Sequence, residues 1–265
     1  MTKWLLIFAA LLVALLVVSF GLGGRKEGAL EVIGSTSIEP FAEMLAQEYE
    51  KAYPGRYVNV QGGGSTAGIQ AAINGIADIG MCSRALKADE TGFRDFIIAR
   101  DGLAIVIHPS NPVSNLTRAQ IGKVFAGNIT NWRGLGGEDR PIHVISREEG
   151  SGTREAFMKL VMGKVRVSRK ALTQESNGAV KELVRNDPGA IGYMSLGLAH
   201  GLKLVAVDGV APSTEAALSG NYPLVRPFLF VTRGEPSERA KAFIDYVLSP
   251  PAQKLLEQEG LVRAK

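Results

Sequence analysis

The sequence predicts an α/β fold arranged as two lobes. Strand-like apolar runs alternate with helix-like segments from about residue 30 onward, a pattern typical of parallel or mixed sheets flanked by helices. An uninterrupted apolar run at residues 103–107 indicates a strand buried on both faces, and residues 108–112 after it resemble a crossing between lobes. With a return near Tyr222, we expect one lobe from residues 28–108 plus 223–265, and the other from residues 109–222.

The first 24 residues differ in character from the rest. Lys3 precedes an uncharged apolar run from Trp4 to Phe20, and glycine-rich residues 21–24 follow. This order is typical of a signal peptide for export, although the run is near the length of a short membrane span. Cleavage near Gly24 and retention as a single membrane anchor therefore both stay open. In either case we expect the rest of the chain to be periplasmic or otherwise extracytoplasmic.

Three strand–turn segments are expected at the start of the first lobe. A strand at residues 30–33 ends in the small polar turn 34–37, before a helix with an apolar face from Ile38 to Ala52. A strand at residues 57–60 leads to the glycine-rich turn 61–66 and a helix with an apolar stripe from Ile69 to Ile76. A short strand at residues 77–81 closes with residues 82–84. Each of the three strands is therefore followed by at least one serine, and in the third an arginine lies beside it.

The second lobe is expected to contain the same kind of unit. Thr117 can cap a helix that runs to Phe125, and we expect Trp132 to pack inside its own lobe rather than stack on a ligand. A strand at residues 142–145 leads to a turn and a helix at residues 154–161. A polar turn at residues 174–177 precedes a short helix at 178–185. Further strands follow at residues 190–194, 204–207 and 224–231, and Ser237 and Ser249 open two C-terminal helices.

The turn from Arg147 to Thr153 is suited to bind an anion. Ser151 can cap the following helix, whose first amide groups have no intrahelical partner and lie at the positive end of the helix dipole. Arg147 adds a planar pair of donors. Arg84 is a second candidate cation, with a surface ion pair as the alternative. Because the carboxyl ends of strands border the ligand crevice in such sheets, we expect a tetrahedral oxyanion to bind between the lobes.

Composition excludes several other functions. The net charge of +4 at pH 7 is dispersed along the chain, so no basic patch for nucleic acid is expected. Cys82 is the only cysteine and the three histidines are scattered, so we expect no metal site and no cofactor. An enzyme that used Ser65 or Ser151 as a nucleophile would need an activating base. No histidine lies in the turns, and we therefore expect no catalytic residue.

Several segments resemble the phosphate-binding proteins of bacterial ABC phosphate importers, the PstS-like family of the periplasmic binding protein superfamily. The most specific is Arg147 to Thr153, and others lie at residues 34–37, 62–68, 77–84, 116–132 and 188–193. The resemblance implies a type II fold in which each lobe is a mixed sheet flanked by helices, with the ligand in the cleft between lobes. It implies phosphate-binding roles for Thr36, Ser37, Ser65, Arg147, Ser151, Gly152 and Thr153. We add Ser83 and Arg84 by position, and Ser35 and Asn177 as further candidates in the turns.

The sequence departs from the family pattern at one position. Some family members carry an acidic residue where Ser83 stands, and a serine has no charge to repel sulfate. Sulfate or molybdate therefore stays an alternative to inorganic phosphate. The resemblance further implies a monomer that delivers phosphate to an ABC permease of the inner membrane. The long apolar N-terminus, with no cysteine after it, leaves a membrane-tethered oxyanion sensor or scavenger as a second alternative.

Overall fold

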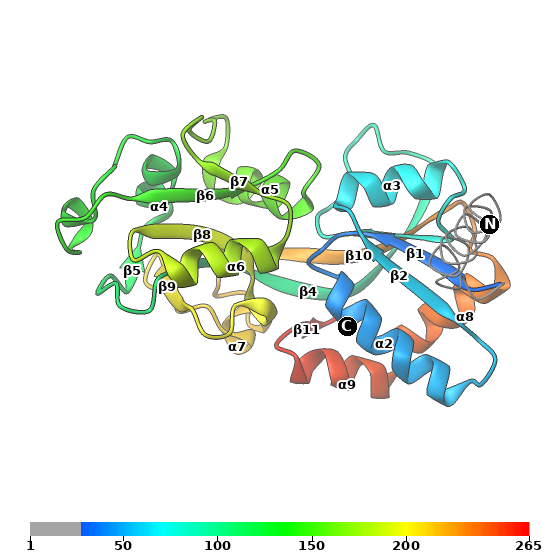
Figure 1. Ribbon diagram of the computed structural model, residues 1–265. Helices are drawn as coiled ribbons and strands as arrows, with labels where there is room; N and C mark the ends of the chain where they lie inside the picture. The colour runs from blue at the N-terminus through cyan, green and yellow to red at the C-terminus, as the bar shows by residue number, and fades with distance from the viewer. Residues whose placement is uncertain (1–27, 265) are drawn as a thin grey trace, which may run out of the picture.

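The structure is a computed structural model that describes residues 28–264 (Figure 1). The expected signal peptide or anchor at residues 1–24 lies outside the described residues. Between residues 28 and 264, none of the helices combines the length and apolar character needed to cross a bilayer. The chain forms two lobes, each a sheet flanked by helices, as the sequence predicts.

The elements divide between the lobes as follows. The first lobe contains β1 (Leu30–Gly34), α2 (Glu39–Ala52), β2 (Val58–Gly62), α3 (Ser65–Ile73), β3 (Ile79–Cys82), α8 (Glu238–Val247), α9 (Pro250–Gln258) and β11 (Val262–Arg263). The second lobe contains β5 (Asn115–Leu116), α4 (Arg118–Phe125), β6 (His143–Arg147), α5 (Gly152–Phe157), β7 (Leu172–Gln174), α6 (Asn177–Asn186), β8 (Ala190–Ser195), β9 (Lys203–Val207) and α7 (Thr214–Leu218). Two long strands, β4 (Phe93–Ile107) and β10 (Val225–Arg233), lie where the lobes join.

The first lobe is built on a mixed sheet with the strand order β2-β1-β3-β10-β4. Strands β1, β2 and β3 run parallel, and β10 runs antiparallel to both β3 and β4. Alternate residues of β1 are buried, so that Leu30 and Val32 face a core completed by Phe41 of α2 and Phe243 of α8. Because parallel strands end at the same edge, the turns after β1, β2 and β3 lie side by side.

The second lobe has the strand order β9-β4-β8-β6-β7, with β5 beside β9. Strands β6, β7 and β8 are parallel. The core includes Phe157 and Tyr193, whose rings stack with centroids 4.0 Å apart. Trp132 is 1% exposed and donates from Nε1 to the Gly189 carbonyl at 3.0 Å. The expectation that Trp132 packs inside its own lobe is confirmed.

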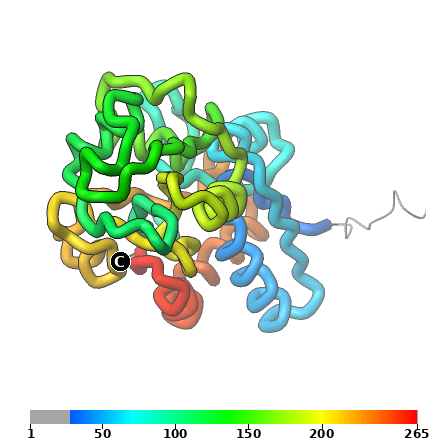
Figure 2. Tube along the Cα trace, turned by 60° about the vertical axis from the view of Figure 1, so that its left-hand side comes forward, coloured from blue at the N-terminus to red at the C-terminus, as the bar shows by residue number. Residues whose placement is uncertain are grey.

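Strand β4 runs through both lobes without a break. Its first part pairs with β10, and residues 103–107 pair with β8 and β9. Ile98 belongs to the first core, whereas Leu103 and Leu224 belong to the second. Figure 2 shows the green and yellow segments of the second lobe gathered on one side of the chain trace. We propose a division at Gly102 and Leu224, earlier in β4 than the crossing predicted after His108.

Most helix ends follow the signals in the sequence. Thr117 and Gln120 form a reciprocal capping pair at the start of α4, and Ser237 caps α8 through the backbone N–H of residue 240. Ser249 forms no such side-chain bond, and prolines occupy the first positions of α9 instead. The apolar stripe expected to reach Ile76 ends earlier, because α3 stops at Ile73 and Ile76 is 59% exposed.

Candidate functional site

Turns from both lobes meet at one place between the lobes. Ser37, in the turn after β1, has its hydroxyl oxygen 2.8 Å from Thr153 Oγ1 on α5. Asn177, at the start of α6, donates from Nδ2 to the same Ser37 oxygen at 2.9 Å. The backbone also joins the lobes, since Thr66 N donates to Gly150 O at 3.1 Å. The fold thus brings together candidates that lie far apart in the sequence.

Two further hydroxyls lie against the start of α5. Ser65 and Ser83 are fully buried, with their hydroxyl oxygens 3.3 Å apart, and Ser83 N donates to Ser65 Oγ at 3.0 Å. A Cβ atom added to Gly152 would overlap Ser65 Oγ and lie 2.6 Å from Ser83 Oγ. Only a glycine therefore allows the turns after β2 and β3 to approach α5 this closely. We refer to Ser37, Ser65, Ser83 and Thr153 as the hydroxyl cluster.

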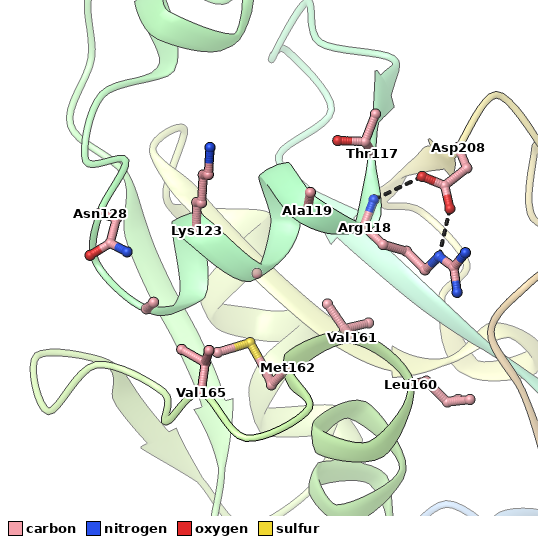
Figure 3. Close-up of a pocket in the computed structure, with 12 residues that line it drawn as sticks. Thr117, Arg118, Ala119, Lys123, Asn128, Leu160, Val161, Met162, Val165 and Asp208 are labelled. Atoms are coloured by element: carbon pink, nitrogen blue, oxygen red, sulfur yellow. Dashed lines mark hydrogen bonds and ion pairs between the residues drawn. The ribbon is translucent and has the colours of Figure 1, made fainter.

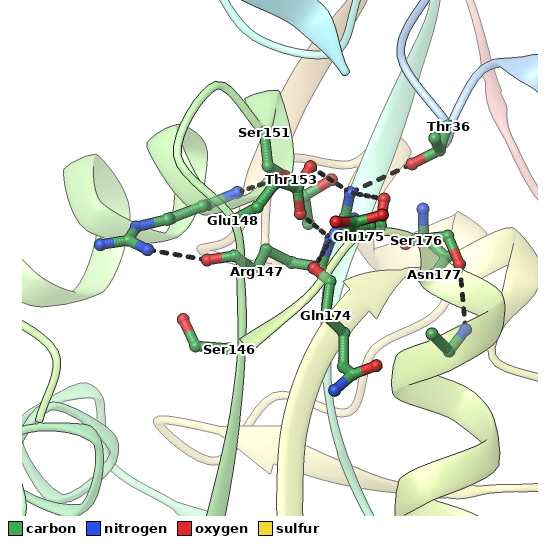
Figure 4. Close-up of polar contacts among 12 residues, drawn as sticks. Thr36, Ser146, Arg147, Glu148, Ser151, Thr153, Gln174, Glu175, Ser176 and Asn177 are labelled. Atoms are coloured by element: carbon green, nitrogen blue, oxygen red, sulfur yellow. Dashed lines mark hydrogen bonds and ion pairs between the residues drawn. The ribbon is translucent and has the colours of Figure 1, made fainter. Parts of the chain in front are cut away.

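Arg147, the last residue of β6, is 1% exposed. Its Nη2 donates to Thr36 Oγ1 in the first lobe at 3.1 Å and to the Glu175 carbonyl at 3.1 Å, and its Nε donates to the Gln174 carbonyl at 3.1 Å (Figure 4). The third nitrogen, Nη1, is buried and has no hydrogen-bond partner among residues 28–264. A buried guanidinium nitrogen without a partner is costly, so this atom is poised to donate to an anion.

Glu148 lies beside Arg147 and partly balances its charge. The Glu148 carboxylate is 2.9 Å from Arg147 Nε and 3.0 Å from Nη2, and its side chain is 24% exposed. Both bonds leave Nη1 unoccupied. The pair therefore fixes the orientation of the guanidinium without covering its remaining donor.

Two of the predicted serines shape their own turns. Ser151 Oγ accepts from Arg154 N at 3.2 Å, so Ser151 caps α5 as the sequence predicts. Ser35 Oγ accepts from Ser37 N at 3.2 Å in the turn after β1. A hydroxyl that accepts one bond can still donate its hydrogen, so both side chains keep a donor for a ligand.

Arg84 is placed differently from the other candidates. Its Nη1 and Nη2 each lie 2.7 Å from an oxygen of Glu90, and its Nε lies 2.9 Å from Glu155 of α5. The side chain is 5% exposed, so this is a buried pair rather than the surface pair considered from the sequence. Among the residues that the structure describes, its polar side-chain contacts go to Ala85, Glu90 and Glu155, and none goes to the hydroxyl cluster.

A sequence profile of the PBP superfamily domain matches residues 23–251. The chain belongs to the PBP superfamily. Its fold is similar to a structure from Clostridium perfringens, described as a phosphate ABC transporter substrate-binding protein with bound phosphate. That match has 38% identity and a TM-score of 0.86, and it covers 90% of this chain and 100% of the other.

Two other relatives carry similar descriptions. An ABC-type phosphate transport receptor from Vibrio cholerae is 38% identical with a TM-score of 0.75, over 88% of this chain and 99% of that one. The phosphate-binding protein PstS of Bacillus subtilis (strain 168) is 29% identical over 245 residues, which is 90% of this chain and 81% of the relative. The predicted family and fold class are therefore confirmed.

The sequence analysis missed two charged residues of this PBP-superfamily site. Arg226 on β10 is 2% exposed and Asp101 on β4 is fully buried, and they face each other in the strand register. Burial raises the pKa of the Asp101 carboxyl, while attraction to Arg226 and a hydrogen bond from Ser195 favour its charged form. A single arginine inside the apolar run at residues 224–231 was the available signal. A charge in a buried strand requires a partner, and the sequence does not reveal which one.

A separate surface cavity of about 530 Å³ lies in the second lobe, between α4 and the short π-helix Met158–Met162 that follows α5. Figure 3 shows Thr117, Lys123 and Val161 around it, with Arg118 paired to Asp208 at its rim. None of the predicted ligand-binding residues lines this cavity. Within residues 28–264, no group of three or more His, Cys, Asp or Glu side chains is arranged to hold a metal ion.

Proposed function

We propose that this protein is an extracytoplasmic solute-binding protein that captures inorganic phosphate for an ATP-driven importer. The observation that carries the proposal is the Nη1 atom of buried Arg147, which has no partner among residues 28–264 and lies where the turns of both lobes meet. Phosphate transport is named in the descriptions of the similar structures from Clostridium perfringens and Vibrio cholerae, and phosphate binding in that of the Bacillus subtilis relative. A tetrahedral anion would supply the acceptor that this guanidinium lacks.

The proposed ligand set draws donors from both lobes. It consists of Thr36, Ser37, Ser65, Ser83, Arg147, Ser151, Gly152 and Thr153, with Ser35 and Asn177 as supporting residues. Arg84 is proposed in a lesser role, as a residue that holds Glu155 across the seam between lobes. Because no single lobe holds all these groups, the anion would be bound fully only when the lobes close around it.

Closure would strengthen each bond to the anion. The hydroxyl cluster is 1% exposed or less at each of its four members. Removing water from such a site strengthens hydrogen bonds to a charged ligand, because competing solvent is excluded and the local dielectric falls. We propose that an ABC permease in the membrane recognises the closed form of a monomer, and that residues 1–24 direct export or anchor the chain outside the cytoplasm.

The choice between phosphate and sulfate depends on acceptors in the site. Ser83 is uncharged, and Glu148 is occupied by Arg147. We propose phosphate as the ligand on the strength of the similar proteins, with sulfate or molybdate as competitors. The site offers nothing that favours an enzyme, since among the described residues no histidine contacts Ser65 or Ser151.

Calorimetric titration of the purified full-length chain tests the proposal. Phosphate should bind with one-to-one stoichiometry, and sulfate titrated afterwards should displace it weakly or not at all. Absence of heat with phosphate, in protein that unfolds cooperatively on heating, would overturn the proposal. To test coupling to transport, the gene can be expressed in a strain that lacks its own phosphate-binding protein. Failure of uptake despite tight binding would favour a tethered sensor or scavenger.

A further inference from the structure

Arg226 and Asp101 form a buried ion pair directly behind the hydroxyl cluster. Arg226 Nε lies 3.0 Å and Nη2 lies 2.9 Å from Asp101 Oδ2. Ser195 donates from Oγ to the other carboxylate oxygen at 2.8 Å. Both charged residues lie on the strands that join the lobes, so the guanidinium is fixed at the junction itself.

The outer nitrogens of Arg226 reach hydroxyls from both lobes. Nη1 donates to Thr153 Oγ1 at 2.8 Å, and Nη2 donates to Ser37 Oγ at 3.2 Å. Longer contacts, of 3.3 and 3.4 Å, join Nη1 to the carbonyl and hydroxyl oxygens of Ser83. One side chain thus contacts three of the four members of the hydroxyl cluster.

These contacts determine which way the hydroxyl hydrogens point. A hydroxyl oxygen has two lone pairs and one hydrogen. Ser37 Oγ accepts from Asn177 and from Arg226, so its hydrogen is left to donate to Thr153 Oγ1 at 2.8 Å. Thr153 Oγ1 then accepts from both Ser37 and Arg226, and its own hydrogen must point to another acceptor. The chain of bonds ends in a donor at Thr153, and hydrogen bonds in series polarise one another.

We propose that Arg226 is a positioning residue of the anion site. Held by Asp101, it orients the Ser37 and Thr153 hydroxyls so that Thr153 presents a hydrogen to the ligand. The ligand class that fits is an oxyanion whose oxygen facing Thr153 carries no hydrogen. This inference rests on the proposed function, because it specifies how the same site binds its anion.

Arg226→Lys tests the proposal with the positive charge retained. Lysine can pair with Asp101, but its single nitrogen cannot also hold both Ser37 and Thr153 in place. We expect phosphate to bind at least tenfold more weakly, as for loss of one charge-assisted hydrogen bond. Arg233→Lys is the matched control on the same strand, since that arginine is exposed and, among residues 28–264, its side chain donates a hydrogen bond to the Ile73 carbonyl rather than to the hydroxyl cluster. Its affinity should equal that of the unmodified protein.

A double-mutant cycle separates positioning from general support of the fold. If Arg226 acts through Thr153, then Arg226→Lys should weaken binding far less in a Thr153→Val background than in the unmodified protein. If Arg226 only supports the fold, the fold-changes in phosphate affinity of the two single variants should multiply in the double variant. The proposal would be overturned if the losses of phosphate affinity in the two variants were independent of each other, or if Arg226→Lys left the affinity unchanged. If the unmodified protein binds no phosphate, the proposed function itself fails instead.

A second variant covers the case in which Arg226→Lys does not fold. Replacing both partners, as Asp101→Leu with Arg226→Met, removes the buried pair without leaving an unpaired charge. Protein cores often tolerate such a replacement of a buried ion pair by apolar residues. The folded double variant should bind phosphate at least tenfold more weakly than the unmodified protein. Equal affinity would show that the pair does not position the site.

Discussion

Arg147 donates from Nη2 to Thr36 Oγ1 at 3.1 Å, and this bond joins the last residue of β6 in one lobe to the turn after β1 in the other. The Nε and Nη2 atoms of the same guanidinium also donate to carbonyls of the second lobe. Arg147 is therefore fixed to its own lobe, and among the described residues its side chain bonds to the first lobe through a single hydroxyl, that of Thr36. We expect that bond to form when the lobes close and to break when they open.

Replacing Arg147 should affect binding more than any other single change. Arg147→Ala removes the positive charge together with Nη1, the donor that has no partner within the described part of the chain and that we propose contacts the anion. Charge-assisted hydrogen bonds contribute about 1.5–3 kcal/mol, so phosphate affinity measured by calorimetry should fall by a factor of ten or more. Arg133→Ala, at an exposed position in the second lobe, serves as the control. An affinity within twofold of the unmodified protein would remove Arg147 from the site.

Gly152→Ala should hold the lobes apart. The added Cβ would overlap Ser65 Oγ, which belongs to the opposite lobe, so closure would require one of the two turns to shift. We expect weaker phosphate binding and, in small-angle scattering with saturating phosphate, a larger radius of gyration than the unmodified protein shows. Gly134→Ala is the matched control for Gly152→Ala, because a Cβ atom at residue 134 meets no described atom within 4 Å. Normal compaction in the Gly152 variant would contradict this role.

Glu155→Gln should weaken closure modestly. The Glu155 carboxylate lies 2.9 Å from both Arg84 Nε and Lys87 Nζ, across the seam between lobes. Its side chain is 25% exposed, and ion pairs that water can reach contribute about 0.2–1 kcal/mol. Calorimetry should show phosphate binding weakened by up to about fivefold, with the difference shrinking as salt is added. Glu182→Gln, which removes a pair within one helix, should leave binding unchanged.

Glu90 should make stability depend on pH in a defined direction. Burial alone would raise the pKa of Glu90, but hydrogen bonds from Arg84 and from the Lys87 backbone, together with their charges, hold the pKa below its usual range. A carboxyl with a lowered pKa stabilises the fold above its ordinary pKa, and this contribution is lost as pH falls through the folded-state value. Glu90→Gln should therefore cost about 2 kcal/mol in urea unfolding near pH 7.

The same measurement at acid pH provides the check. Protonated glutamate and glutamine carry no charge, so the two proteins should approach equal stability at low pH. A stability gap that stays constant from neutral to acid pH would mean that the Arg84–Glu90 pair contributes no pH dependence to folding.

Local signals in the sequence predicted the turns of the candidate site, but they did not predict the buried ion pair of Arg226 and Asp101 behind those turns. Ser35, Ser65 and Ser151 follow strands within a few residues, so their place at the carboxyl ends could be inferred from neighbouring residues alone. Arg226 and Asp101 lie in strands 125 residues apart, and their pairing depends on strand register. Register between distant strands leaves no local pattern in a single sequence, so neither residue could be assigned.

The length of β4 was missed for a related reason. Residues 93–101 include Arg94, Asp95, Arg100 and Asp101 among apolar side chains, and this charge concealed a strand that continues to Ile107. Arg84 was identified as a cation, but its contact with the second lobe was not, because Glu155 reaches it only through the tertiary fold. Side chains whose partners lie nearby in sequence were therefore predicted better than those whose partners lie elsewhere in the fold.

The first core contains Val32 and Phe41 from the start of the chain and Phe228 and Phe243 from its last forty residues. Neither group can complete that core without the other. The second core is drawn from one continuous stretch, between Leu103 and Val225. As the chain emerges from its N-terminus on the outer side of the membrane, the middle of the chain can thus fold once residue 225 has appeared, whereas the N-terminal strands must wait for the last forty residues.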